Sequence, residues 1–178
     1  MTQTIQAYLP GGDVSLELNG TWTAYWLFLL GVFTGWWMFH AGFTKVWGNY
    51  VLGSPFDAAW FIEFASQGTI LEGVLAVFNS SGGIAFTNLM IPCAETLIGL
   101  GILLGAFTRL AAFFGGFLMI FFVFVNAAWS HGFVNSDLMG LLLFVTVAVF
   151  GAGRVWGVDQ YLERMDWAQH PIAKALLG

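Results

Sequence analysis

The sequence predicts an all-α integral membrane protein, built as an antiparallel bundle of four transmembrane helices. Of its 178 residues, 58% are hydrophobic and only 8% are charged, whereas soluble domains carry about a quarter charged residues. The apolar residues form four long blocks, each close to the roughly 20 residues that a helix needs to cross a bilayer. Tryptophan and tyrosine flank the first block, as is typical of membrane interfaces. We therefore expect one multi-pass membrane domain over residues 1–178, with the lipid bilayer as its surroundings.

The chain is expected to open with an N-terminal tail over residues 1–20 and a first span over 21–43. The tail contains no lysine or arginine and no apolar core, so it does not resemble a signal peptide. Trp22 and Trp26 stand at one end of the span, and Trp36 and Trp37 stand near the other.

Two short interfacial helices are predicted over residues 54–80, between the first and second spans. The stretch "SPFDAAWFIEFASQG" has Pro55 at the position typical of a first helical residue, and Gly68 as a stop signal. A second stretch, "TILEGVLAVFNSSGG", begins with the capping pattern of Thr69 and Glu72. Both stretches are too short to span, so we expect them on the outer side, either lying on the bilayer or plugging the end of the bundle.

The remaining spans are predicted over residues 84–107, 110–130 and 136–156, followed by a tail over 159–178. Only a short turn separates the second and third spans, which predicts a tight antiparallel hairpin. The tail mixes charged and apolar residues and is predicted to form a cytoplasmic amphipathic helix that is broken at Pro171.

The distribution of basic residues predicts the orientation. With four crossings, Arg109, Arg154, Arg164 and Lys174 lie on one side of the membrane, and only Lys45 lies on the other. The positive-inside rule then places both termini in the cytoplasm of a protein of the cell (plasma) membrane.

Charge and cysteine content exclude several classes of function. The net charge of −5 argues against nucleic acid as a partner. Cys93 is the only cysteine, which rules out an intramolecular disulfide and a paired-cysteine redox centre. The chain also contains no motif typical of a flavin, nucleotide, phosphate or metal site.

Glu95 is the first candidate functional residue. Asn88, Pro92, Glu95 and Gly99 fall on one helical face, and this polar or small face should point into the bundle. Ionisable groups within a membrane are costly and often mark functional sites. Glu95 is thus interpreted either as a group that exchanges protons or as a structural hydrogen-bonding group between helices.

Other polar residues are expected above Glu95, in the outer half of the bundle. Lys45 could neutralise either Glu95 or Asp137. Together with aromatic side chains, these groups are typical of a site for a quinone head group, with protons exchanged by an acid or a histidine. Haem is disfavoured, because one pair of histidines at one end offers weak ligation. The predicted catalytic residues are Glu95, Lys45 and His40, and the predicted quinone contacts are His131, Asn126, Asp137 and Trp37.

Simpler roles remain open for several of these residues. His40 and His131 could be solvated interfacial histidines, and Asp137 could be a helix N-terminal charge.

Three segments resemble the DoxX/DoxD family of small four-helix membrane proteins. They are "FHAGFTKVWG" (39–48), "CAETLIGLGILLGAFTRLAAF" (93–113) and "FGAGRVWGVDQYL" (150–162). The segments occur in the family's order, and the resemblance covers residues 22–162. The residues that match the family pattern are Lys45, Glu95, Arg109, Arg154 and Asp159.

The resemblance implies a membrane oxidoreductase subunit, since some members belong to thiosulfate:quinone oxidoreductase. It also implies a structural network of Arg109, Arg154 and Asp159 at the cytoplasmic helix ends. We therefore expect a membrane subunit of a quinone-linked respiratory oxidoreductase. The alternative is a non-catalytic accessory or scaffold subunit of a respiratory complex, such as a terminal oxidase. Either function would involve other membrane subunits or a second copy of the chain.

Overall fold

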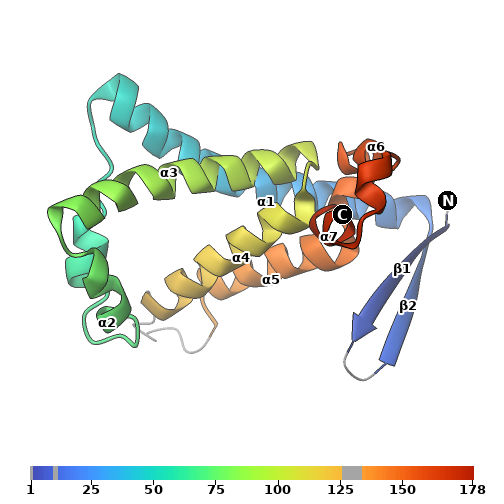
Figure 1. Cartoon of the computed structure of the whole chain (residues 1–178), viewed down its shortest axis with the longest axis horizontal. Coiled ribbons are helices and arrows are strands. Elements are labelled where there is room, and N and C mark those ends of the chain that lie inside the picture. Colours follow the sequence, from blue (N-terminus) through green and yellow to red (C-terminus); the bar gives the residue numbers. More distant parts are fainter. Residues whose placement is uncertain (1, 10–11, 126–133) are drawn as a thin grey trace.

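Four long helices lie side by side in the computed structural model, which describes residues 2–9, 12–125 and 134–178 (Figure 1). They are α1 (Thr21–Trp47), α3 (Ser81–Leu104), α4 (Thr108–Val125) and α5 (Ser136–Phe150). Local signals set two of the starts: the Ser80 hydroxyl accepts from the Gly83 amide, and the Asn135 side chain accepts from the Leu138 amide. Left-handed glycines, Gly105 and Gly151, end α3 and α5, because glycine adopts this conformation at little cost.

Three helices of the described residues are long and apolar enough to cross a membrane: α1 with its continuation (Thr21–Leu52), α3 and α4. The fourth apolar helix, α5, has 15 residues, fewer than the roughly 20 of a full span. After α5, the chain nevertheless lies at the end of the molecule where α4 begins. There the Arg109 side chain of α4 donates a hydrogen bond to the Lys174 carbonyl of the tail (3.2 Å). The membrane character is thus supported, and the fourth crossing stays a prediction.

The backbones of α1 and α3 are in direct contact through glycines. A Cβ on Gly42 would lie 2.3 Å from the Thr96 nitrogen, and one on Gly99 would lie 2.1 Å from the Phe39 nitrogen. Small residues at helix interfaces permit this close approach, which provides the van der Waals packing that holds membrane helices together.

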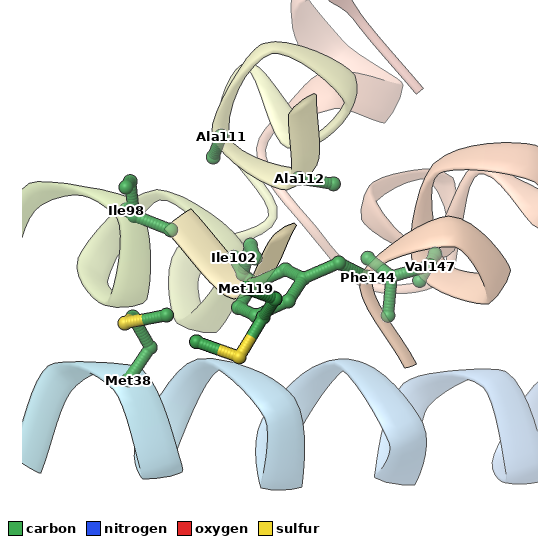
Figure 2. Packing of buried hydrophobic residues seen from close by; sticks show 9 residues of the cluster. Met38, Ile98, Ile102, Ala111, Ala112, Met119, Phe144 and Val147 are labelled. Atoms are coloured by element: carbon green, nitrogen blue, oxygen red, sulfur yellow. The ribbon is translucent and has the colours of Figure 1, made fainter. Parts of the chain in front are cut away.

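The apolar core lies where all four long helices meet (Figure 2). The Phe144 side chain of α5 is fully buried at its centre, and its ring covers Gly115 of α4, where a Cβ would be 2.3 Å from a ring carbon. The buried side chains packed in this cluster include Met38 of α1, Ile98 and Ile102 of α3, and Met119 of α4.

The segment between α1 and α3 is less helical than predicted. The first helix continues as a π-helix over Gly48–Leu52, and residues 54–57 have no regular structure. Short helical pieces follow at Phe61–Ala65, α2 (Glu72–Leu75) and Ala76–Phe78. The left-handed glycine at 68 separates two short helical stretches, at the position predicted for the stop signal. The first stretch begins later than predicted, because residues 54–57 have no regular structure. A position at the membrane surface remains a prediction for these pieces.

The first 20 residues contain two antiparallel strands where the sequence analysis expected only a tail. They are β1 (Thr2–Leu9) and β2 (Gly12–Asn19), with Thr2 opposite Asn19. Alternating apolar and polar residues, as in "TIQAYL" and "VSLEL", give the period of two that favours a strand.

The tail after α5 also differs from the predicted amphipathic helix over 159–178. It is divided into α6 (Asp159–Leu162), a 3₁₀ turn (Asp166–Gln169) and α7 (Pro171–Leu176). The predicted break at Pro171 is present, since α7 begins at this residue, but the part before it is also divided. The tail folds back against the start of α4 (Figure 1), and Leu177 is 0% exposed. It is therefore part of the packed structure.

Candidate functional site

Lys45 of α1 and Glu95 of α3 form an ion pair between the two helices. Glu95 is 2% exposed, whereas the Lys45 side chain is 28% exposed. Gly42 lies one turn before Lys45, and a Cβ there would lie 2.7 Å from the Glu95 Cβ. Because this glycine brings the helices together, the lysine reaches a carboxylate that is almost fully enclosed. Of the two partners predicted for Lys45, the structure pairs it with Glu95.

The connection after α1 covers this ion pair. We call residues 53–58 the cap segment. The Asn88 side chain of α3 accepts a hydrogen bond from the Ala58 amide (2.7 Å), and the Asn49 side chain accepts one from the Phe56 amide. The Phe56 ring lies over the Lys45 ammonium, 5.3 Å from nitrogen to ring centroid. The ion pair is thus enclosed by two helices and one aromatic side chain.

This arrangement places a carboxyl group and a hydrogen-bond donor side by side. The ammonium group has three N–H donors, of which one is directed at Glu95. A neighbouring cation reduces the cost of a carboxylate within the apolar interior. A group that reached Lys45 could therefore receive a hydrogen bond from the lysine and exchange a proton with the acid.

The other predicted outer residues are not all at this ion pair. His40 is exposed on α1, with its ring 6.0 Å from that of Trp36, on the face opposite buried Met38. Trp37 packs on α5, where a Cβ on Gly140 would be 2.6 Å from its ring. Asp137 is partly buried in the first turn of α5. Asn126 and His131 lie outside the described residues.

Asp159 organises the opposite end of the four helices. Its carboxylate is 0% exposed and accepts from the amides of Phe107 (2.7 Å), Thr108 (2.9 Å) and Gly178 (3.1 Å). Two of these amides belong to the start of α4, where backbone N–H groups lack helical partners and a negative charge is favourable. Asp159 thus caps a helix that begins 51 residues earlier and ties the tail to it.

The two arginines of the predicted network bind different partners. Arg109 donates to the carbonyls of Ala148 and Lys174, both at 3.2 Å. Arg154 forms an ion pair with Glu163 (2.7 Å). Arg109, Arg154 and Asp159 thus lie at the same end of the molecule, but their hydrogen bonds and ion pair go to different partners.

A small pocket also opens at this end, between α1, the turn after α3 and Trp156. Its volume is about 20 Å³, and Phe28, Gly105 and Gly157 are among its lining residues. That volume has room for about one water molecule, so this pocket is too small for a quinone ring.

Sequence reasoning missed the residues that cover and complete these sites. Asn49 lies four residues after Lys45, which puts both on one helical face, so its spacing could have identified it. Asn88 was placed on the Glu95 face, but its bond to the cap segment depends on a distant loop. The position of Phe56 depends on the same loop. Glu163 pairs with Arg154 nine residues earlier, across a turn, so helical spacing could not identify it.

A family model described as "DoxD: TQO small subunit DoxD" matches residues 26–174, a range that includes Lys45, Glu95 and Asp159. No curated protein and no solved structure matches the chain.

Proposed function

The chain belongs to the DoxD family, and on that premise we propose that it is the membrane subunit of an oxidoreductase that passes electrons from thiosulfate to quinone. The family implies a subunit of a complex like thiosulfate:quinone oxidoreductase. The observation that carries the proposal is the enclosed pair of Lys45 and Glu95, because an acid inside the helices beside a partly exposed lysine is suited to exchange protons at a bound oxygen.

The donor set at this pair fits a quinone head group. A quinone takes up two electrons and two protons when it is reduced to a quinol. In the proposed function, Lys45 donates a hydrogen bond to a quinone oxygen, and the Glu95 carboxylate takes up a proton from water and passes it to that oxygen. The second proton reaches the other quinone oxygen from water. Lys45 would also hold the acid in position between turnovers, since the two side chains are already in contact.

The electrons come from thiosulfate in this proposal. Two thiosulfate ions form one new S–S bond, giving tetrathionate and releasing the two electrons that quinone accepts. Recognition of such an anion calls for several basic groups, and Lys45 is the only lysine or arginine before Arg109. We therefore propose that another subunit binds the thiosulfate and that this chain supplies the quinone site.

The test is thiosulfate-dependent quinone reduction in membranes that carry the Glu95→Gln variant. Reduction should fall by about 100-fold or more, the usual contribution of a positioned acid or base. Glu63→Gln is the matched control, because Glu63 lies in the connecting segment rather than at the pair. Protein levels are compared by immunoblot. If Glu95→Gln leaves both quinone binding and reduction at the wild-type level, the proposal fails.

A second candidate is a non-catalytic accessory subunit of a respiratory complex. The ion pair supports it as well, because a carboxylate neutralised by a lysine can serve only to join two helices. In this case Glu95→Gln would reduce the amount of assembled complex, while activity per assembled complex would stay unchanged. Purification from native membranes provides a further test, since an accessory subunit must copurify with its complex.

A further inference from the structure

The cap segment is attached to the helices by a small number of contacts. Two side-chain oxygens, from Asn49 and Asn88, accept its amides at Phe56 and Ala58. Ala58 is 1% exposed and forms the inner end of the segment. Residues 53–55 and 57 are exposed and residues 54–57 have no regular structure, so regular backbone pairing does not hold them.

The start of the segment is a tight reversal at the end of the π-helix. Gly53 has a left-handed φ of 65°, and the Ser54 amide donates to the Gly48 carbonyl (3.0 Å). A Cβ on Gly48 would lie 3.0 Å from the Ser54 oxygen. The hydrogen bond between Ser54 and Gly48 therefore fixes where the chain turns back toward Lys45. The turn follows a π-helix, an element that is frequent at functional sites.

We propose that residues 53–58 form a movable cap over the Lys45–Glu95 pair, and that Asn49 and Asn88 are the positioning residues that hold it closed. The Phe56 ring of this segment lies over the ammonium group, and the two asparagine contacts keep the ring there. Release of these contacts moves the ring away and opens the pair to a ligand.

The contacts of the cap also indicate which ligand it admits, an inference that rests on the proposed function. An aromatic face over an ammonium group is a favourable cation–π contact, and a flat ligand ring can take the place of Phe56. Once the cap lifts, the asparagine oxygens lose their amide donors and can accept hydroxyl groups. The matching ligand is a flat ring that bears carbonyl or hydroxyl oxygens, which describes both a quinone and its quinol.

The chain offers a direct assay, because Lys45 and Lys174 are its only lysines. Purified protein in lipid nanodiscs is treated with a water-soluble amine-reactive reagent, and mass spectrometry gives the labelling rate of Lys45 relative to exposed Lys174. Asn88→Ala should raise this ratio about fivefold, as expected for the loss of one hydrogen bond. Thr87→Ala is the matched control, since the Thr87 hydroxyl bonds only to the Gly83 carbonyl of its own helix (2.9 Å).

Phe56→Ala provides a second variant that keeps both asparagines. It should also raise the Lys45 labelling ratio, and hydrogen exchange at residues 53–58 should become faster in Asn88→Ala than in the wild type. Unchanged labelling ratios in both variants would overturn the cap. If Asn88→Ala does not fold, the Lys45 labelling ratio of Phe56→Ala alone tests the cap: a higher ratio than in the wild type supports it, and an unchanged ratio overturns it.

A short-chain quinone analogue separates this proposal from the proposed function. Protection of wild-type Lys45 from labelling by the analogue supports both. If the analogue gives no protection while Asn88→Ala still accelerates labelling, the cap stands and the quinone site at this pair is wrong.

Discussion

Lys45 and Glu95 are 50 positions apart in the sequence, yet their side chains form an ion pair between α1 and α3. The carboxylate is almost fully enclosed, and the lysine is the only side chain with which it forms a salt bridge among the described residues. This pair, the glycine contact beside it, the packing at the opposite end of the helices and the number of crossings can each be tested by measurement.

Removal of the lysine alone should destabilise the protein strongly. Lys45→Met leaves an enclosed carboxylate without its cation, which costs about 3 kcal/mol in comparable buried pairs. The double variant Lys45→Met/Glu95→Leu should recover most of that loss, because it removes both charges. Thermal unfolding in detergent measures the difference. A double variant less stable than Lys45→Met would contradict this role of the pair.

Gly42→Ala should separate α1 from α3. Its new methyl group would meet the Thr96 nitrogen at 2.3 Å, and backbone atoms cannot move aside as a flexible side chain can. We expect a loss of about 1–3 kcal/mol, typical of overpacking. Gly73→Ala is the control, because nothing lies within 4 Å of a Cβ there. Equal thermal midpoints for the two variants would refute the close contact.

Asp159→Asn should weaken the end of the molecule where α4 begins. The amide group of asparagine offers one acceptor oxygen in place of two, so buried backbone N–H groups lose their acceptor at about 1–3 kcal/mol each. Asp166→Asn, at an exposed position, should leave stability unchanged. Hydrogen exchange of the Thr108 and Gly178 amides reports the effect locally, and unchanged protection would show that Asp159 is not their acceptor.

Leu177→Ala should be costly, although it lies close to the end of the sequence. Leu177 is fully buried, whereas Ile172 in the same tail is exposed. Truncation of a buried leucine costs about 2–5 kcal/mol, and Ile172→Ala should cost little. Thermal unfolding of the two variants distinguishes a tail packed on the helices from one lying on the membrane surface. A packed tail loses more stability in Leu177→Ala, whereas a tail on the membrane surface would lose more in Ile172→Ala.

The number of crossings can be counted with single cysteines in a Cys93→Ser background. Four crossings put Asn79→Cys outside the cell and Gln169→Cys inside, so a membrane-impermeant thiol reagent should label only the first in intact cells. Labelling of both would mean that α5 does not complete a span, since an odd number of crossings leaves the tail outside.

The sequence predicted the helical class well because long apolar blocks have few alternatives in a bilayer, where backbone groups must be bonded internally. The starts of α1 and α5 coincide with the predicted ones, at Thr21 and Ser136. The family resemblance is confirmed by the match over residues 26–174. The connecting segment was less predictable: Gly68 ends a helical stretch as expected, but residues 54–57, where capping signals favoured a helix start, have no regular structure.

The candidate site was predicted only in part. The helical period placed Glu95 on an inward face, but it left Lys45 with two possible partners. It also grouped His40 with Lys45 because both stand at one end of α1, although helical rotation puts His40 on the exposed side.

By itself, the sequence determined that this chain forms apolar helices, that Glu95 faces inward, and that the chain resembles the DoxX/DoxD family. These features follow from composition, helical period and local motifs, which depend on residues near one another in the chain. Only the tertiary structure decided that Lys45 reaches Glu95, that Phe56 covers the pair, and that Asp159 caps α4. Each of these contacts depends on how separate segments pack. Glycines let α1 and α3 approach closely enough for the ion pair, asparagine side chains place Phe56, and the folded-back tail brings Asp159 to the start of α4.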